Sequence, residues 1–214
     1  MKSNREGKPV SVDEAVSAIP NHGRVYVAQG SGCPYGLLVG IDDRREMFES
    51  LEFVSAFLLQ RPAPIDHLGQ PFRWLTLQAT GAIRDVLNHP YFGIVPGRYS
   101  DLDGICAPGG PLAADVVICQ VSPPNGSGDC SLGTGVGGHV SLLAEAPLVI
   151  GQINRQMPYV HGDGECHTEN FDFLVEIDEP LSELQPASID PIADAIAQHV
   201  SPFIPDGSTL QFGI

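Results

Sequence analysis

The chain has 214 residues, 43% of them hydrophobic, and its 26 acidic and 11 basic side chains give a formal net charge of −15. This composition is typical of a globular protein with a buried core, and the acidic balance excludes the basic surface that nucleic acids require. No apolar run is long enough to span a bilayer, and the N-terminal stretch MKSNREGKPV has no signal-type apolar segment. We therefore expect a cytoplasmic protein without nucleic-acid or membrane partners.

The cysteines give no sign of a disulfide framework or of a metal site. There are five of them, an odd number, and no pair has the C-x-x-C spacing of a zinc site. We expect most of them to be reduced thiols that behave as small apolar residues, and we expect no metal cofactor. They are Cys33, Cys106, Cys119, Cys130 and Cys166.

The first third of the chain predicts a helix, then a strand, a glycine turn and a second helix. Ser11 and Glu14 form a capping box ahead of apolar residues at helical spacing. A β-rich run at 24–29 leads into the turn GSGCPYG, and residues 37–60 then show helical periodicity. This order is that of a strand–turn–helix unit.

Further strands are predicted at residues 72–80, 115–122, 146–154 and 171–178. The second and third are almost unbroken apolar runs, as expected of strands buried on both faces, whereas the fourth alternates and looks more exposed on one face. Strands that alternate with helices indicate an α/β fold, and we expect one domain with a mostly parallel sheet flanked by helices.

The C-terminal part predicts one more helix and one more strand. Asp190 is a candidate N-cap and Pro191 suits the first helical position, with apolar residues at core spacing. These apolar residues are Ile192, Ile196 and Val200. Residues 208–214 read as a strand, after which a parallel sheet needs a crossover helix, so we expect the sequence to stop within a βα unit.

The stretch QVSPPNGSGDCSLGTGVGG contains Gly133-x-Gly135-x-x-Gly138, the spacing of a dinucleotide-binding loop. Such a loop should follow its strand directly and have an acidic residue about 20 positions later. Here ten residues separate the strand from Gly133, and the first acid after the next strand, Asp163, falls in a loop. The alternative is that the glycines allow tight backbone approach. An NAD(P)-dependent oxidoreductase is therefore the weakest hypothesis.

Three segments in series resemble a known family. They are DVVICQVSPPNGSGDCSLGTGV, PLVIGQINRQMPYVHGDGECHTENFDFLVEIDEPLSEL and DPIADAIAQHVSPFIPDGSTLQFGI. Their order and spacing, from about residue 9 to the end, are similar to the first half of the acetyl-CoA hydrolase and 4-hydroxybutyrate CoA-transferase family. Two features depart from the pattern: Asn125 stands where the family usually has Asp, and the segment GRYSDLDGICAPGGPLAADV is shorter.

The resemblance implies a CoA-transferase-like α/β fold and covalent chemistry on coenzyme A. In this family a glutamate attacks an acyl-CoA thioester, and the resulting glutamyl-CoA thioester passes CoA to a small carboxylate or to water. That glutamate follows a GIG turn in a motif resembling GxHTE, which lies beyond this sequence. We therefore expect an N-terminal half that is inactive without a C-terminal catalytic domain or subunit; whether it forms a homo-oligomer stays open.

The resemblance also implies candidate contacts to CoA. Gly213 and Ile214 would begin the CoA-binding GIG turn. The other glycine turn, Gly30-Ser31-Gly32, is a candidate oxyanion or substrate loop, because glycine amides can approach a reacting carbonyl closely.

The letters His167-Thr168-Glu169 repeat part of the catalytic motif, but their neighbours match the family's GDxxxH element instead. Glu169 is therefore better interpreted as a solvated acid than as the nucleophile. His167 could orient a substrate carboxylate or make only a local hydrogen bond. Arg98 could pair with a substrate anion or with a structural aspartate, and Asn154 could contact a ligand or cap a turn.

A hypothesis from another class remains open. The chain could be a non-catalytic binding or assembly module that keeps the fold without the chemistry. A neighbouring chain that carries GIGxxP and HTE motifs would favour the enzyme.

Overall fold

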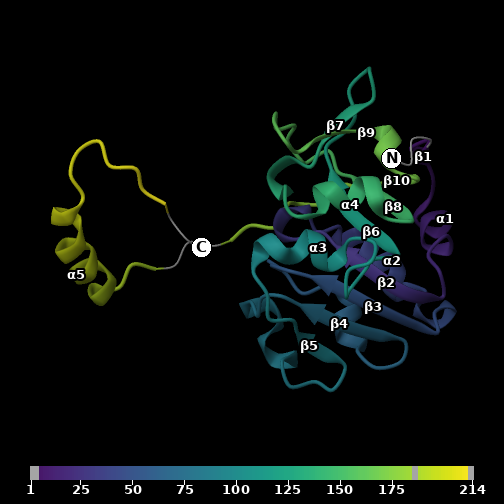
Figure 1. Ribbon diagram of the computed structural model, residues 1–214, viewed down its shortest axis with the longest axis horizontal. Coiled ribbons are helices and arrows are strands. Elements are labelled where there is room, and N and C mark those ends of the chain that lie inside the picture. Colours follow the sequence, from purple (N-terminus) through teal and green to yellow (C-terminus); the bar gives the residue numbers. More distant parts are fainter. Residues whose placement is uncertain (1–4, 185–187, 212–214) are drawn as a thin grey trace. The chain divides into compact units, whose positions relative to one another are not determined.

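The computed structural model describes residues 5–184 and 188–211. The chain divides into two compact units, Met1–Glu183 and Leu184–Ile214 (Figure 1). The first unit holds the sheet and four helices, and the second holds the helix α5 (Pro191–Val200).

The first unit is built on an eight-stranded sheet in which every neighbouring pair is parallel. The strand order is β1-β10-β8-β6-β2-β3-β4-β5. The bounds are β1 Lys8–Pro9, β2 His22–Val27, β3 Ser50–Ser55, β4 Phe72–Thr76, β5 Phe92–Ile94, β6 Val116–Val121, β8 Leu148–Ile153 and β10 Phe173–Glu176. A separate antiparallel pair joins β7 (Asp129–Ser131) to β9 (Glu165–His167).

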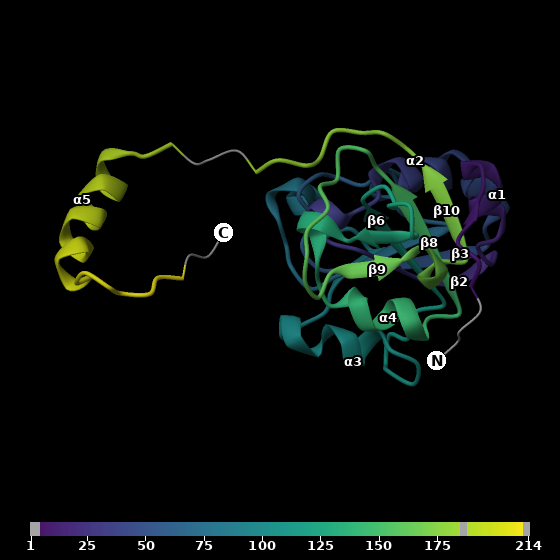
Figure 2. The same ribbon diagram turned by 90° about the horizontal axis from the view of Figure 1, so that it is seen from above.

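Helices cover both faces of the sheet (Figure 2). On one face lie α1 (Val12–Ser17) and α2 (Tyr35–Asp43), and on the other lie α3 (Leu102–Cys106) and α4 (His139–Glu145). Because side chains alternate along a strand, Val25 and Val27 of β2 enter the first core while Tyr26 enters the second. The expected α/β fold with a parallel sheet and flanking helices is confirmed.

The strand order reverses between β2 and β6. From β2 the chain adds β3, β4 and β5 toward one edge, and then returns to place β6 on the other side of β2. In doubly wound α/β sheets this reversal leaves a crevice outside the carboxyl ends of the two strands, where ligands bind. The segments that follow β2 and β6 are therefore the first place to look for a site.

Two predicted helix starts are confirmed in atomic detail. The Ser11 hydroxyl accepts a hydrogen bond from the Glu14 N–H at 3.2 Å, and the Glu14 carboxylate accepts one from the Ser11 N–H at 3.0 Å. At α5, Asp190 accepts from the Ala193 N–H at 2.7 Å. Both predictions hold because each capping side chain accepts a hydrogen bond from a backbone N–H of the first helical turn that has no partner within the helix.

The helix predicted over 37–60 is wrong beyond Asp43. The helix α2 ends there, a short 3₁₀ turn occupies Arg45–Met47, and Ser50–Ser55 is the strand β3. This strand pairs with β2 on one side and β4 on the other. The spacing of its apolar residues is compatible with a helix and with a strand. The extended form is adopted because it pairs with two neighbouring strands.

The strand predicted over 208–214 is not found in the part that the structure describes. Residues 208–211 are irregular, because no neighbouring strand pairs with them, and 212–214 lie outside the described residues. The three apolar residues of α5 expected at core positions are also exposed, at 71% for Ile192, 58% for Ile196 and 49% for Val200. Within residues 188–211 nothing packs over them.

Candidate functional site

Two glycine turns meet at the carboxyl ends of the central strands. The 3₁₀ turn η1 (Gly30–Gly32) follows β2, and the turn η6 (Gly133–Gly135) lies beyond β6. A Cβ added to Gly32 would lie 2.9 Å from the Gly135 carbonyl oxygen, and one added to Gly135 would overlap the Gly32 backbone. The Ser31 and Thr134 hydroxyls are 2.8 Å apart. Glycine is required because the two backbones touch, which favours the tight-approach interpretation over a nucleotide cradle.

Internal hydrogen bonds hold η1 in place. The Gly30 N–H donates to the Phe57 carbonyl at 2.7 Å, and the Gly32 N–H donates to the Gln29 carbonyl at 3.0 Å. Gly30 has φ +58°, and an added Cβ would meet no atom within 4 Å, so glycine is needed there for its backbone conformation alone. These bonds and the glycine conformation fix the shape of the turn, and its role as an oxyanion loop stays a prediction.

Below the two turns lies a buried network of amide side chains. Gln120 of β6 stands directly opposite Gln152 of β8, and Asn154 follows that strand. The Gln120 Oε1 accepts from Gln152 Nε2 at 3.1 Å and from Asn154 Nδ2 at 2.6 Å. The Gln120 Nε2 donates to the Ser31 carbonyl at 2.8 Å, which links the network to η1. Buried amides that are paired in this way fix one arrangement of the backbone around them.

The same network anchors the first turn of α2. The Gln152 Oε1 accepts from the Leu37 N–H at 2.9 Å, while its Nε2 donates to the Glu179 carboxylate at 2.6 Å. The sequence analysis missed Gln120 and Gln152. A signal was available, since each is the single polar residue inside an apolar strand, a position where burial demands a partner.

Asn154 is buried and its side chain is engaged on both ends. Its Nδ2 donates to the Glu179 carbonyl at 2.8 Å, and its Oδ1 accepts from the Gln156 N–H at 2.9 Å. These bonds fit the turn-capping alternative. A direct contact to substrate stays a prediction.

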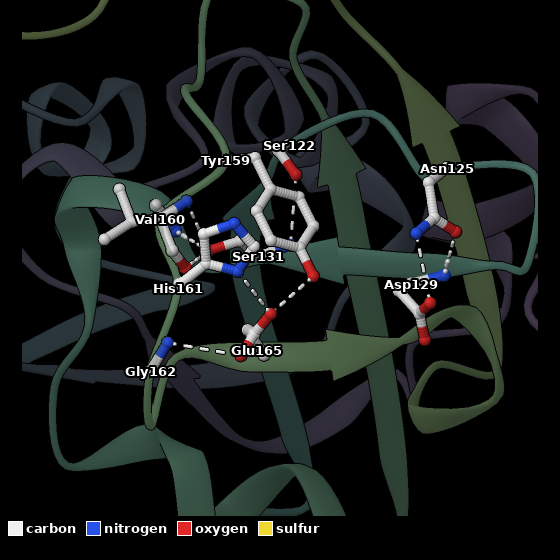
Figure 3. A network of polar contacts seen from close by, with 10 residues as sticks. Ser122, Asn125, Asp129, Ser131, Tyr159, Val160, His161, Gly162 and Glu165 are labelled. Atoms are coloured by element: carbon white, nitrogen blue, oxygen red, sulfur yellow. Dashed lines mark hydrogen bonds and ion pairs between the residues drawn. The ribbon is translucent and has the colours of Figure 1, made fainter.

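In the glycine-rich segment 122–133, the side chains of two buried serines, Ser122 and Ser131, hold the backbone through hydrogen bonds (Figure 3). The Ser122 Oγ accepts from the Ser131 N–H at 3.0 Å. The Ser131 Oγ in turn accepts from the Gly133 N–H at 3.0 Å and donates to the Val160 carbonyl at 2.7 Å. Gly133 has φ +58° and lies against Met157, so no side chain fits there. The loop thus fixes η6 against the segment that follows β8.

Asn125, the departure from the family pattern, forms a turn with Asp129. Its Oδ1 accepts from the Ser127 and Asp129 N–H groups at 2.8 and 2.9 Å, and its Nδ2 donates to the Asp129 carboxylate at 3.0 Å. An aspartate at 125 could not make this last bond, because an ionised carboxylate only accepts. The amide is therefore matched to the neighbouring Asp129.

The side chains of Tyr159, His161 and Glu165 converge in the segment that leads from β8 to β9 (Figure 3). The Glu165 carboxylate accepts from His161 Nδ1 at 2.9 Å, from the Tyr159 hydroxyl at 2.8 Å and from the Gly162 N–H at 3.2 Å. These bonds lower the pKa of Glu165, and the bond from His161 has the largest effect. The bond to Glu165 raises the pKa of Tyr159 to about 12. The carboxylate is therefore ionised at neutral pH and orders the segment 159–165.

His167 and Glu169 are engaged with their own neighbourhood. The His167 Nε2 lies 2.9 Å from the Ser127 carbonyl, and its Nδ1 accepts from the Glu169 N–H at 3.2 Å. Gly128 packs on the ring, since an added Cβ would come within 2.6 Å of His167 Nε2. The Glu169 side chain is 75% exposed, as expected of a solvated acid.

Of the remaining predicted residues, Arg98 lies in the described part of the chain, and no contact there brings it to the turns. Arg98 is exposed and precedes a 3₁₀ turn, where its N–H donates to Asp101 at 3.2 Å. Gly213 and Ile214 lie outside the described residues. The structure therefore unites Gly30–Gly32 and Asn154 through Gln120, and leaves the other candidates to be tested in solution.

A second polar cluster lies buried on the opposite face, under the start of α4. His139 and Tyr26 are both fully buried, with ring centroids 6.1 Å apart. Within the described residues neither ring nitrogen of His139 has a hydrogen-bond partner, and neither does the Tyr26 hydroxyl. Burial lowers the pKa of His139 to about 4, so this histidine is neutral in the folded protein.

Residues 5–184 and 188–211 contain no group of three or more histidine, cysteine or acidic side chains that could hold a metal ion. In the same ranges no helix is both long and apolar enough to cross a membrane.

Residues 6–184 match the acetyl-CoA hydrolase/transferase N-terminal domain. The chain belongs to the acetyl-CoA hydrolase/transferase family. This match confirms the predicted resemblance. The matched range contains both glycine turns, the amide network and the two buried serines Ser122 and Ser131.

Curated family members are similar over nearly the whole chain. A 4-hydroxybutyrate coenzyme A transferase of Clostridium kluyveri is 31% identical over 208 residues, which is 97% of this chain and 48% of that protein. A succinyl-CoA:acetate/propanoyl-CoA:succinate CoA transferase of Fasciola hepatica is 25% identical and covers 94% of this chain and 42% of its own length. The chain thus spans about half the length of the curated relatives it matches.

Solved structures show the same fold. RipA from Yersinia pestis superposes with a TM-score of 0.86 at 23% identity, covering 97% of this chain and 51% of its own. A 4-hydroxybutyrate CoA-transferase from Porphyromonas gingivalis gives a TM-score of 0.72 at 23% identity, covering 96% of this chain and 48% of its own.

Proposed function

We propose that this chain is the N-terminal half of an acyl-CoA:carboxylate CoA-transferase or acyl-CoA hydrolase. It works with a C-terminal catalytic domain or subunit, on an acyl-CoA and a small carboxylate. A glutamate of that second half attacks the thioester, and the glutamyl-CoA thioester formed then passes CoA to the acceptor carboxylate or to water. Family membership supports the reaction class, and the half-length coverage of the relatives supports the second half. A cytoplasmic location stays a prediction.

The observation that carries the proposal is the contact between η1 and η6 where the strand order reverses. This is the edge of an α/β sheet at which ligands bind. The amide network and Ser131 hold the two turns in place through hydrogen bonds. Transition-state stabilisation requires donors that are fixed before the reaction. The Gly30 and Gly32 N–H groups are bonded to the Phe57 and Gln29 carbonyls, so we assign this turn a shaping role beside the thioester.

The candidate residues take roles that suit their surroundings. Gly30-Ser31-Gly32 forms the wall beside the thioester, with Asn154 positioning it through Gln120. Arg98 is exposed and its guanidinium can pair with a phosphate or carboxylate of a substrate. His167 orders the family's GDxxxH element, and Gly213 and Ile214 begin the turn that receives CoA.

The test compares the chain alone with a protein that also contains the C-terminal half encoded downstream or by an adjacent gene. We expect exchange of labelled acetate into acetyl-CoA only when both halves are present. Mass spectrometry of the two-half protein mixed with acetyl-CoA should find a CoA adduct on a glutamate outside residues 1–214.

A covalent adduct on Glu169 in the chain alone would contradict the proposal that the nucleophilic glutamate belongs to the C-terminal half. Binding of CoA by the two-half protein without any exchange or hydrolysis would instead favour the non-catalytic binding module. The internal hydrogen bonds of Gly30, Gly32 and Asn154 are the observation that keeps this second candidate in view.

A further inference from the structure

Two cysteines that are 36 residues apart face each other across the β7–β9 pair. Cys130 and Cys166 are directly opposed in the antiparallel register, and their sulfur atoms are 3.4 Å apart. Opposed antiparallel residues have Cα atoms about 4.5–5.5 Å apart, within the roughly 4.4–6.8 Å that a disulfide spans. Bond formation therefore needs side-chain rotation and no rearrangement of the strands.

The surroundings separate this pair from the other thiols. Cys130 is buried at 1% exposure, whereas Cys166 is only partly buried. A proton shared between the two sulfurs lowers the pKa of Cys130 and raises that of Cys166. Burial raises the pKa of Cys106 to about 11 and also raises the pKa of Cys119. Only the pair thus combines access with a neighbouring thiol.

Metal binding is the other chemistry that paired thiols offer. A tetrahedral site for a soft metal needs further ligands close to the two sulfurs. No third histidine, cysteine or acidic side chain joins them among the residues that the structure describes.

We propose that Cys130 and Cys166 are an oxidisable dithiol, which a peroxide converts into a disulfide that ties β7 to β9. One sulfur of the pair attacks a peroxide oxygen as the thiolate, an S–O bond forms, the O–O bond breaks, and the departing hydroxide takes up that thiol's proton and leaves as water. The other sulfur then attacks the oxidised one, the S–S bond forms, the S–O bond breaks, and the second water carries away the remaining thiol proton. Two thiols and one hydrogen peroxide give one disulfide and two waters.

The disulfide would act on the segment between the two strands. Ser131, next to Cys130, holds the Val160 backbone, and Glu165, next to Cys166, holds Tyr159 and His161. A covalent bond between the strands prevents these two anchors from separating. Residues 157–164 should therefore open less often in the oxidised chain.

The experiment treats the full chain with hydrogen peroxide, blocks free thiols with N-ethylmaleimide after unfolding, and maps peptides by mass spectrometry. We expect three alkylated cysteines, a peptide linking Cys130 to Cys166, and a mass loss of two hydrogens that dithiothreitol reverses. Amide hydrogen exchange should slow several-fold in residues 157–164 after oxidation.

Cys166→Ser should abolish the linked peptide, and Cys33→Ser, a buried cysteine away from the strand pair, should keep it. A disulfide that joins Cys119 to Cys130 would overturn the proposal. So would recovery of both Cys130 and Cys166 as alkylated or as sulfinic acid at peroxide doses that oxidise free cysteine. Because these outcomes are read from thiol mapping, they do not depend on the CoA chemistry proposed above.

Discussion

At the scale of single residues, the contact between Gly32 and Gly135 leaves no room for a side chain at position 135. Gly135→Ala places a Cβ against the Gly32 backbone, and backbone cannot move aside as a flexible side chain can. We expect a loss of about 1–3 kcal/mol in the free energy of unfolding, as for other overpacked sites. Urea denaturation followed by circular dichroism measures it.

Gly104→Ala is the matched control, because an added Cβ there meets no atom within 4 Å and the residue lies in α3. Alanine in a helix should be neutral or stabilise by about 0.5–1 kcal/mol. Equal destabilisation by both substitutions would contradict the close backbone approach.

The buried His139 predicts a stability that depends on pH. Its pKa is about 4 when folded, against 6.5 for an ordinary histidine, because burial excludes the charged ring. Between these values only the unfolded chain binds the proton, so stability is full above pH 6.5 and falls as the pH drops toward 4. The full effect of this shift is on the order of 3 kcal/mol.

Carboxylates titrate over the same range, so the measurement is a comparison of wild type with His139→Leu. The leucine cannot bind a proton and leaves no unpaired ring nitrogen beside Tyr26. The free energy of unfolding of the variant should decline less between pH 7 and pH 4.5. Parallel profiles for the two proteins would show that His139 titrates alike in both states.

At the scale of elements, Gln152 joins the strand β8 to the first turn of α2. Gln152→Leu removes the acceptor of the Leu37 N–H and the donor to Glu179. A buried group left without its partner costs roughly 1–3 kcal/mol, so we expect a total loss of roughly 2–4 kcal/mol. Chemical denaturation measures it, and hydrogen exchange should rise at the start of α2.

Gln156→Leu provides the same chemical change on an exposed residue of the following loop. It should alter the free energy of unfolding by less than about 0.5 kcal/mol. A similar small effect for Gln152→Leu would mean that the amide network does not hold α2 in place.

The elements also show what the sequence can predict by itself. The capping box at Ser11 and the N-cap at Asp190 were predicted because each is settled by residues three positions apart. The strand β3 was not, since its extended form depends on pairing with β2 and β4, which lie elsewhere in the sequence. Local signals survive folding, whereas pairing is decided by the whole sheet.

At the scale of the whole molecule, the candidate site joins two turns that are 103 residues apart in the sequence. The local sequences GSG at 30–32 and GTG at 133–135 do not predict that the two turns touch. The reversal of strand order brings them together. The resemblance to the family makes Gly30–Gly32 a candidate substrate loop, but it does not predict the contact of this turn with Gly133–Gly135. The amide network escaped prediction, because the pairing of Gln120 with Gln152 follows from the register of β6 and β8.

The last prediction concerns self-association of the chain. Within residues 188–211 nothing packs over the apolar row of α5, and the curated relatives are about twice as long as this chain. An uncovered apolar row favours association, so we expect the chain alone to form dimers or larger species at micromolar concentration. Ile196→Glu should shift it toward the monomer, measured by sedimentation velocity or light scattering.

Ala197→Glu adds the same charge one residue further along the helix, about 100° away from the apolar row. It should therefore change association less than Ile196→Glu does. If both variants dissociate the chain equally, added negative charge is the cause, because a chain of net charge −15 gains repulsion from either substitution. If neither has an effect, association does not involve α5.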